Sequence, residues 1–183
     1  MIQLDRPAIE TALPLVAKGL TQYCWLQAAL PTTNVASDRT FQTAFNGFYR
    51  VRRNREWQTA FYRLLEEQKS RRPPFAEVLE ALHITTGKVE ASFASKLVAS
   101  VDPDKPVIDD FVLQNLGLRL LRTGPADRRR ARAVEIHDRI GQVFADYLET
   151  DIGRHLISRF EQSYPNRQLT RIKMLDLVLW QAR

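Results

Sequence analysis

The sequence predicts an all-α protein, a single multi-helical domain of roughly eight to ten helices over residues 1–183. Apolar residues recur at spacings of three and four, and no segment alternates with the two-residue period of a strand. The length of 183 residues is enough to bury one substantial core. Because no fixed-period repeat or low-complexity linker divides the chain, we expect one domain, or two helical halves that meet near residues 84–118.

The first third of the chain predicts three helical regions. Apolar residues in 9–20 fit one or two N-terminal helices, with Pro14 as a break or restart. A phenylalanine stripe in 41–48 marks the next region. Asn54 is then placed to cap a helix that runs to about residue 70.

The middle of the chain predicts shorter elements. A helix over 75–82 is expected to close in a loop at 83–88, where Gly87 can adopt a positive φ. Two aspartates precede the apolar positions of 109–118, which is typical of a capped helix, and Gly117 can end that helix early.

The remaining helices are predicted from inward-facing apolar stripes alone. Phe93, Leu97 and Val101 mark one of them. A loop at 120–127 then precedes a long helix with its stripe in 134–147. Two further stripes follow, in 152–160 and in 172–179.

The net charge of +6 is concentrated in two arginine-rich segments. Residues 47–72 and residues 119–132 each carry a local charge of +5, whereas the segment between them carries −4. The planar guanidinium group of arginine suits paired hydrogen bonds to phosphate, so the clusters favour a nucleic-acid partner. The alternative is that these arginines cover helix surfaces and pair with the acidic middle segment. The candidate nucleic-acid-binding residues are Arg50, Arg52, Arg53, Arg55, Arg71, Arg72, Arg128, Arg129 and Arg130.

Several other functional classes lack support in the sequence. The lone Cys24 has no disulfide partner, and the three histidines lack metal-ligand spacing, so we expect no metal and no cofactor. The sequence contains no nucleotide-binding glycine loop and no G-x-S-x-G motif. No run of 18 apolar residues and no secretory signal is recognisable, which predicts a cytoplasmic protein that does not insert into a membrane.

Residues 84–118 carry a family resemblance. A glycine-bearing loop, an apolar helix and a proline-containing turn precede the segment Pro106-Val107-Ile108-Asp109-Asp110-Phe111-Val112. This order resembles the core of the helix-hairpin-helix DNA glycosylase superfamily, and Asp109 falls on that family's catalytic aspartate. The loop Ile84-Thr85-Thr86-Gly87-Lys88-Val89 has one glycine and no proline where the family has two glycines and a proline. The resemblance therefore implies a DNA-glycosylase-like fold with a degenerate hairpin, whose hold on a DNA phosphate is in doubt.

The resemblance also implies candidate chemistry. Asp109 would stabilise the sugar cation that forms when an N-glycosidic bond breaks, although an aspartate at this place can equally be the N-cap of helix 109–118. Some family members add an amine nucleophile, for which Lys88 and Lys96 are the candidates; each can equally be a surface lysine.

The aromatic residues of the first basic cluster offer a third type of site. Tyr49 is the candidate for stacking on a base, because we expect Trp57 to be core and Tyr49 to be more open. The sequence thus favours a DNA-binding protein that excises a damaged or modified base through Asp109. The alternative is a non-enzymatic helical module that binds nucleic acid or an acidic protein.

Overall fold

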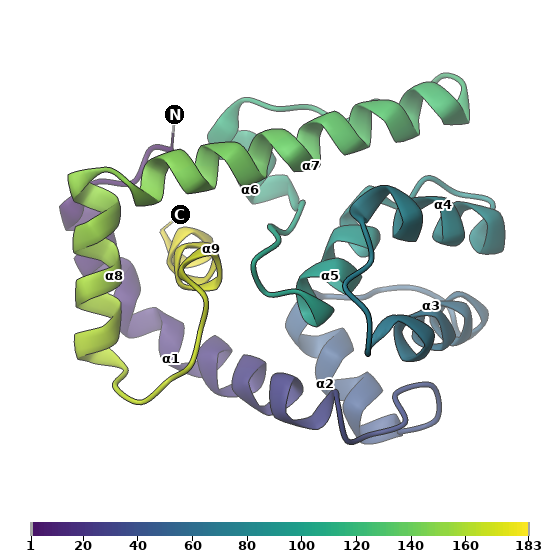
Figure 1. Cartoon of the computed structure of the whole chain (residues 1–183), viewed down its shortest axis with the longest axis horizontal. Coiled ribbons are helices and arrows are strands. Elements are labelled where there is room, and N and C mark those ends of the chain that lie inside the picture. Colours follow the sequence, from purple (N-terminus) through teal and green to yellow (C-terminus); the bar gives the residue numbers. More distant parts are fainter. Residues whose placement is uncertain (1, 183) are drawn as a thin grey trace.

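The computed structural model describes residues 2–182 of the chain. These residues form nine α-helices joined by loops, and they contain no strand (Figure 1). The helices pack around one hydrophobic core, which confirms the predicted all-α single domain. Their bounds are α1 Arg6–Ala29, α2 Arg39–Tyr49, α3 Arg55–Gln68, α4 Phe75–Thr86, α5 Ala91–Val101, α6 Asp110–Leu116, α7 Ala126–Leu148, α8 Asp151–Ser163 and α9 Arg171–Gln181.

Local capping sets several of these boundaries. Asn54 accepts a hydrogen bond from the Trp57 amide at 3.0 Å and so begins α3, as predicted. Gly87 and Gly117 end α4 and α6 in the left-handed conformation, with φ of 68° and 65°. The predicted positive φ of Gly87 and the early end at Gly117 are therefore confirmed.

Two predicted boundaries are wrong. Helix α1 continues through Pro14 without a break, because Pro14 lies on the exposed face while the opposite face is anchored in the core by Leu13 and Val16. Helix α4 extends past His83 to Thr86, where we expected a loop. The hydroxyl groups of Thr85 and Thr86 bond to carbonyl groups one turn earlier, at 2.7 and 2.6 Å, within this extra turn.

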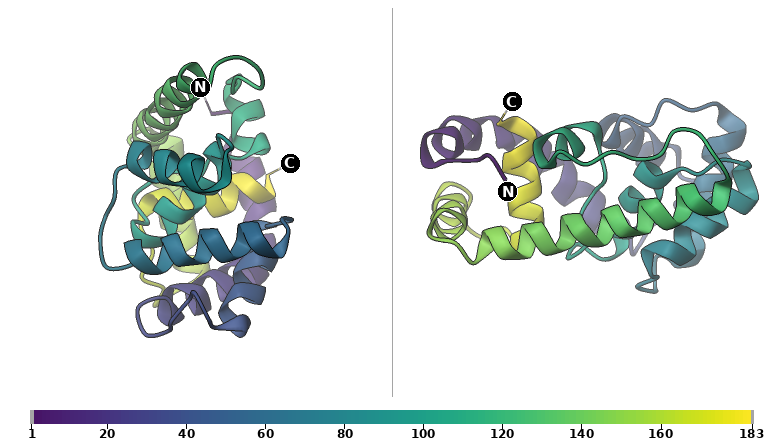
Figure 2. Two further views of the ribbon diagram at one scale, coloured as in Figure 1. Left: turned by 90° about the vertical axis from the view of Figure 1, so that its right-hand side faces the viewer. Right: turned by 90° about the horizontal axis from the view of Figure 1, so that it is seen from above.

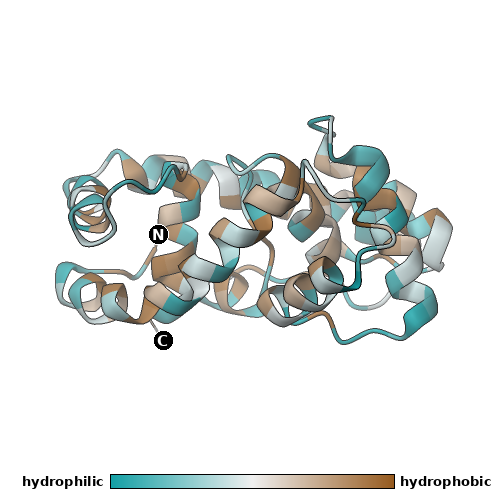
Figure 3. Cartoon of the chain, turned by 90° about the horizontal axis from the view of Figure 1, so that it is seen from below, coloured by the Kyte–Doolittle hydropathy of each residue, from teal (hydrophilic) through white to brown (hydrophobic). Residues whose placement is uncertain are grey.

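Helix α9 occupies the centre of one half of the molecule. Helices α1, α6, α7 and α8 surround it, and its residues Leu175, Val178 and Leu179 are fully buried (Figures 1 and 2). Helices α2 to α5 form a second group, which α1 and the long α7 connect to the first. Hydrophobic and hydrophilic residues alternate along the helices (Figure 3), and the buried hydrophobic residues form the core.

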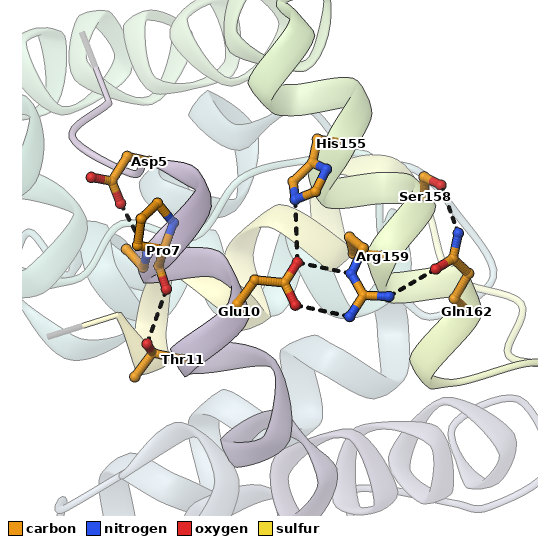
Figure 4. Close-up of polar contacts among 9 residues, drawn as sticks. Asp5, Pro7, Glu10, Thr11, His155, Ser158, Arg159 and Gln162 are labelled. Carbon is orange, nitrogen blue, oxygen red and sulfur yellow. Dashed lines mark hydrogen bonds and ion pairs between the residues drawn. The ribbon is translucent and has the colours of Figure 1, made fainter.

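Hydrogen bonds between polar side chains join the outer surfaces of α1 and α8. Glu10 accepts two hydrogen bonds from the Arg159 guanidinium, both at 2.8 Å, and its Oε1 lies 3.2 Å from Nε2 of His155 (Figure 4). The hydrogen bond from Arg159 is the main cause that holds the pKa of Glu10 below its ordinary value. No helix within residues 2–182 is both long enough and apolar enough to cross a lipid bilayer.

Candidate functional site

A cavity of about 760 Å³ opens where the two groups of helices meet. Its walls come from α1, the end of α2, the start of α5, α6 and α9, with the turns before and after α6. Its aromatic and aliphatic lining carries a few charged groups, a composition typical of ligand sites. The charged residues are Lys18, Arg50, Lys96, Asp109, Asp110 and Asp176. The fold thus brings the separately predicted Asp109, Lys96 and Arg50 to one cavity.

The structure shows Asp109 as a helix cap and also places it in the cavity wall. It is the N-cap of α6, where its Oδ1 accepts a hydrogen bond from the Val112 amide at 2.8 Å, and it also lines the cavity. Burial raises the pKa of Asp109 above its ordinary value and outweighs the lowering effect of the capping amide. Capping therefore does not remove this carboxyl group from the cavity.

The two candidate lysines lie in different surroundings. Lys96 is half-buried on α5 and lines the cavity, with its Nζ 5.1 Å from the centre of the Phe93 ring. Burial lowers the pKa of Lys96, although the nearby carboxylates, Asp109 foremost, oppose that effect. Lys88 is exposed in the turn between α4 and α5 and is not part of the cavity wall.

Asp176 is a second carboxylate of the cavity that the sequence reasoning missed. Its Oδ2 accepts a hydrogen bond at 2.8 Å from Nζ of Lys173, which is 1% exposed. Burial acts to lower the pKa of Lys173, but the charge and hydrogen bond of Asp176, together with Tyr49 and Tyr23, outweigh burial and the pKa is raised. The only signal in the sequence was a charged pair at i and i+3 inside an otherwise apolar helix.

The aromatic candidates are arranged differently from our expectation. Tyr49 is 8% exposed, no more open than Trp57 at 9%, because its ring packs against Phe45 and Phe48 at 4.6 and 4.7 Å. Trp180, at the end of α9, is half-buried in the cavity wall. The Arg50 guanidinium lies over the Trp180 ring, 4.5 Å from its centre.

The arginines form two separate groups rather than one face. Arg50, Arg52, Arg53 and Arg55 follow the end of α2, and Arg50 lines the cavity. Arg71 and Arg130 instead flank α4, where they pair with Glu77 and Glu80 at 3.1 and 2.7 Å.

Acidic residues of the middle segment neutralise part of this charge. Arg53 pairs with the buried Glu90 at 2.9 Å, and Arg130 also pairs with Asp127. Arg129 donates to the Leu121 carbonyl oxygen at 3.4 Å. No ion pair within residues 2–182 engages Arg50, Arg52, Arg55, Arg72, Arg128 or Arg129. Pairing with the acidic segment thus accounts for three of the nine candidates.

The turn that joins α4 to α5 spans four residues, 87–90. Its backbone groups are partly used within the turn: Gly87 donates to His83, and the Lys88 amide donates to the Thr86 hydroxyl at 3.3 Å. The buried carboxylate of Glu90 ends the turn. These contacts leave few free amides for a phosphate at this place.

The chain matches no protein-family model, no curated protein and no solved structure. Within the described residues, no group of three or more His, Cys, Asp or Glu side chains is placed to hold a metal ion. The chemistry of the cavity is therefore the main guide to function.

Proposed function

We propose that the chain binds DNA and takes an unpaired nucleotide into the cavity, where Asp109 stabilises the positive charge that develops on the sugar during excision of the base. The observation that carries this proposal is the half-buried Asp109 carboxyl group, with its raised pKa, in the wall of an open cavity. The volume of about 760 Å³ lies within the usual range for small-ligand sites, about 300–1,000 Å³.

The environment of Asp109 suits the stabilisation of a cation. Its pKa is raised because burial and the negative charge of Asp176 outweigh the capping amide and the positive charge of Lys96. A sugar cation that forms in the cavity would supply further positive charge, and the low dielectric would strengthen the attraction. In the reaction the C–N bond breaks, the base leaves with the bonding electrons, and water adds to the sugar carbon with loss of a proton.

Lys96 provides a group that can accept that proton. Its lowered pKa increases the fraction of neutral amine, and it shares the cavity with Asp109. A neutral amine can also attack the sugar carbon directly, as the resemblance implies. Lys88 is outside the cavity and has no place in this scheme.

The arginines that follow α2 would contact the DNA backbone. Arg50 lines the cavity. Arg52 and Arg55 follow Arg50 closely in sequence, and both are exposed. Guanidinium groups at the edge of a base-sized cavity would hold the phosphates next to the bound nucleotide.

A second candidate function is a nucleic-acid-binding module without chemistry. The observation that favours it is the capping bond of Asp109, which gives this residue a structural role independent of any substrate. This module would use the same arginines but would have no need for the cavity.

Binding to DNA duplexes across a salt series tests the proposal. We would compare an intact duplex with one that carries an abasic-site analogue, using the natural protein, Asp109→Asn and, as the matched control, Asp104→Asn, an exposed aspartate outside the cavity wall. We expect tighter binding to the abasic analogue and a steep salt dependence. Asparagine also caps helices, so Asp109→Asn should fold.

Excision separates the two candidate functions. On duplexes that each contain one damaged base, alkali-labile strand breaks should form with the natural protein and with Asp104→Asn but not with Asp109→Asn. Equal binding to both duplexes without any excision would favour the module. Absence of binding even at low salt would contradict both.

A further inference from the structure

Arg50 has an unusual backbone conformation for its residue type. It ends α2 with φ 54° and ψ 45°, in the left-handed region that glycine adopts most readily. Glycine fills the same position at the ends of α4 and α6. Residues with a strained backbone cluster at functional sites, where the function of the side chain accounts for the retention of the strain.

The side chain of Arg50 reaches a residue of another helix in the cavity wall. Its guanidinium stacks on Trp180 of α9, and both residues line the cavity. Arg50 is nevertheless exposed and has no ion pair within residues 2–182. Such a contact is weak at an exposed position, and so a stronger anionic partner can displace it.

We propose that Arg50 and Trp180 form an exchange site for one nucleotide of a single strand of DNA. The phosphate draws the guanidinium away from the indole, and the base takes its place on the Trp180 ring. This inference rests on the proposed function, since it assigns the phosphate and base contacts of the same cavity.

The exchange matches the chemistry of both partners. A guanidinium binds phosphate through paired, charge-assisted hydrogen bonds, which are stronger than its contact with a ring. A base offers the indole a flat surface of similar size, which accounts for the sequence-tolerant stacking of single-strand binding proteins. The left-handed backbone at Arg50 keeps the side chain at the cavity while it alternates between the two partners.

The test is binding of a labelled oligothymidylate across a salt series. Arg50→Gly removes the guanidinium and relieves the left-handed backbone, so it should fold at least as well as the natural protein. We expect the slope of log K against log salt to fall by about 0.7, the loss of one phosphate contact on a single strand. Trp180→Ala should weaken binding about 10-fold at every salt concentration and leave that slope unchanged.

Tryptophan fluorescence reports the exchange itself. In a Trp25→Phe, Trp57→Phe background, Trp180 is the one remaining tryptophan, and its emission should be quenched when the oligonucleotide binds. Arg154→Ala, an exposed arginine on α8 outside the cavity, is the matched control and should change neither slope nor quenching.

The outcomes separate this inference from the proposed function. Binding with a natural salt slope in Arg50→Gly, or without any change in Trp180 emission, would overturn the exchange site and leave DNA binding elsewhere on the protein. If the natural protein binds neither the oligonucleotide nor the duplexes at low salt, both proposals fail.

Discussion

At the scale of single residues, the buried Lys173–Asp176 pair is the most consequential contact of the cavity. Lys173 Nζ lies 2.8 Å from Asp176 Oδ2 and 5.0 Å from the centre of the Tyr23 ring. Removing one partner of a buried pair leaves the other charge without compensation. Asp176→Asn should therefore lower the free energy of unfolding by about 3–5 kcal/mol, measured by urea unfolding at pH 7.

A double variant identifies the cause of that loss. Lys173→Met with Asp176→Leu replaces both charged side chains with apolar side chains of similar volume, so the double variant should recover most of the stability. Arg132→Ala breaks an exposed pair with Glu135 and should change little. A double variant as unstable as Asp176→Asn would show that the packing, rather than the lone charge, is responsible.

His137 makes the stability depend on pH. It is 4% exposed and stacks on Phe75 at 4.1 Å, and burial lowers its pKa to about 4. Asp138, 3.9 Å away, opposes that effect, whereas Lys105 adds to it. The unfolded chain, with a histidine pKa of about 6.5, binds the proton more strongly, so this contribution is complete above that pH and is lost as the pH falls toward 4.

The expected loss between pH 7 and pH 5 is about 2 kcal/mol. Urea unfolding at several pH values would measure it, with His137→Gln as the comparison because glutamine does not titrate. If His137→Gln keeps the full pH dependence of the natural protein, other groups cause it.

At the scale of elements, local signals predicted boundaries better than they predicted packing. Asn54 and Gly117 act on their nearest backbone groups, so their roles were evident from sequence. Pro14 was misread because its effect depends on whether the rest of α1 is anchored, which only the tertiary contacts decide.

Gly153 is an element-scale feature that the sequence did not reveal. It lies in the first turn of α8, and a Cβ there would be 2.1 Å from the Tyr147 carbonyl oxygen at the end of α7. Because backbone atoms cannot give way, Gly153→Ala should separate α7 from α8 and lower the unfolding free energy by about 3 kcal/mol. A Cβ at Gly47 would meet no neighbouring atom within 4 Å, so Gly47→Ala should instead stabilise α2 by about 0.5–1 kcal/mol. Thermal unfolding would measure both changes. Equal changes in melting temperature in the two variants would contradict this interpretation.

At the scale of the whole molecule, the cavity could not be predicted as a unit. Asp109 and Lys96 were identified through the family resemblance and Arg50 from a charge cluster, but their meeting depends on helices that are far apart in sequence. Asp176 and Trp180 were hidden because an apolar helix such as α9 gives no sign of which face lines a cavity. Spacing alone could not distinguish a core position from a cavity wall.

The distribution of arginines gives a prediction for the molecule as a whole. Arg52 and Arg55 lie at the start of α3, soon after the cavity-lining Arg50, whereas Arg71 and Arg72 follow the other end of α3, roughly 20 Å away along the helix. Arg71 is already paired with Glu77, so the distant group has less free charge to offer DNA.

The two groups should therefore differ in the salt dependence of duplex binding. Arg52→Ala with Arg55→Ala should reduce the slope of log K against log salt by about 1.8, the release expected for two phosphate contacts. Arg71→Ala with Arg72→Ala removes the same formal charge and should leave the slope nearly unchanged. If both pairs reduce the slope equally, DNA contacts the α4 side as well, and the cavity edge is not the preferred path of the backbone.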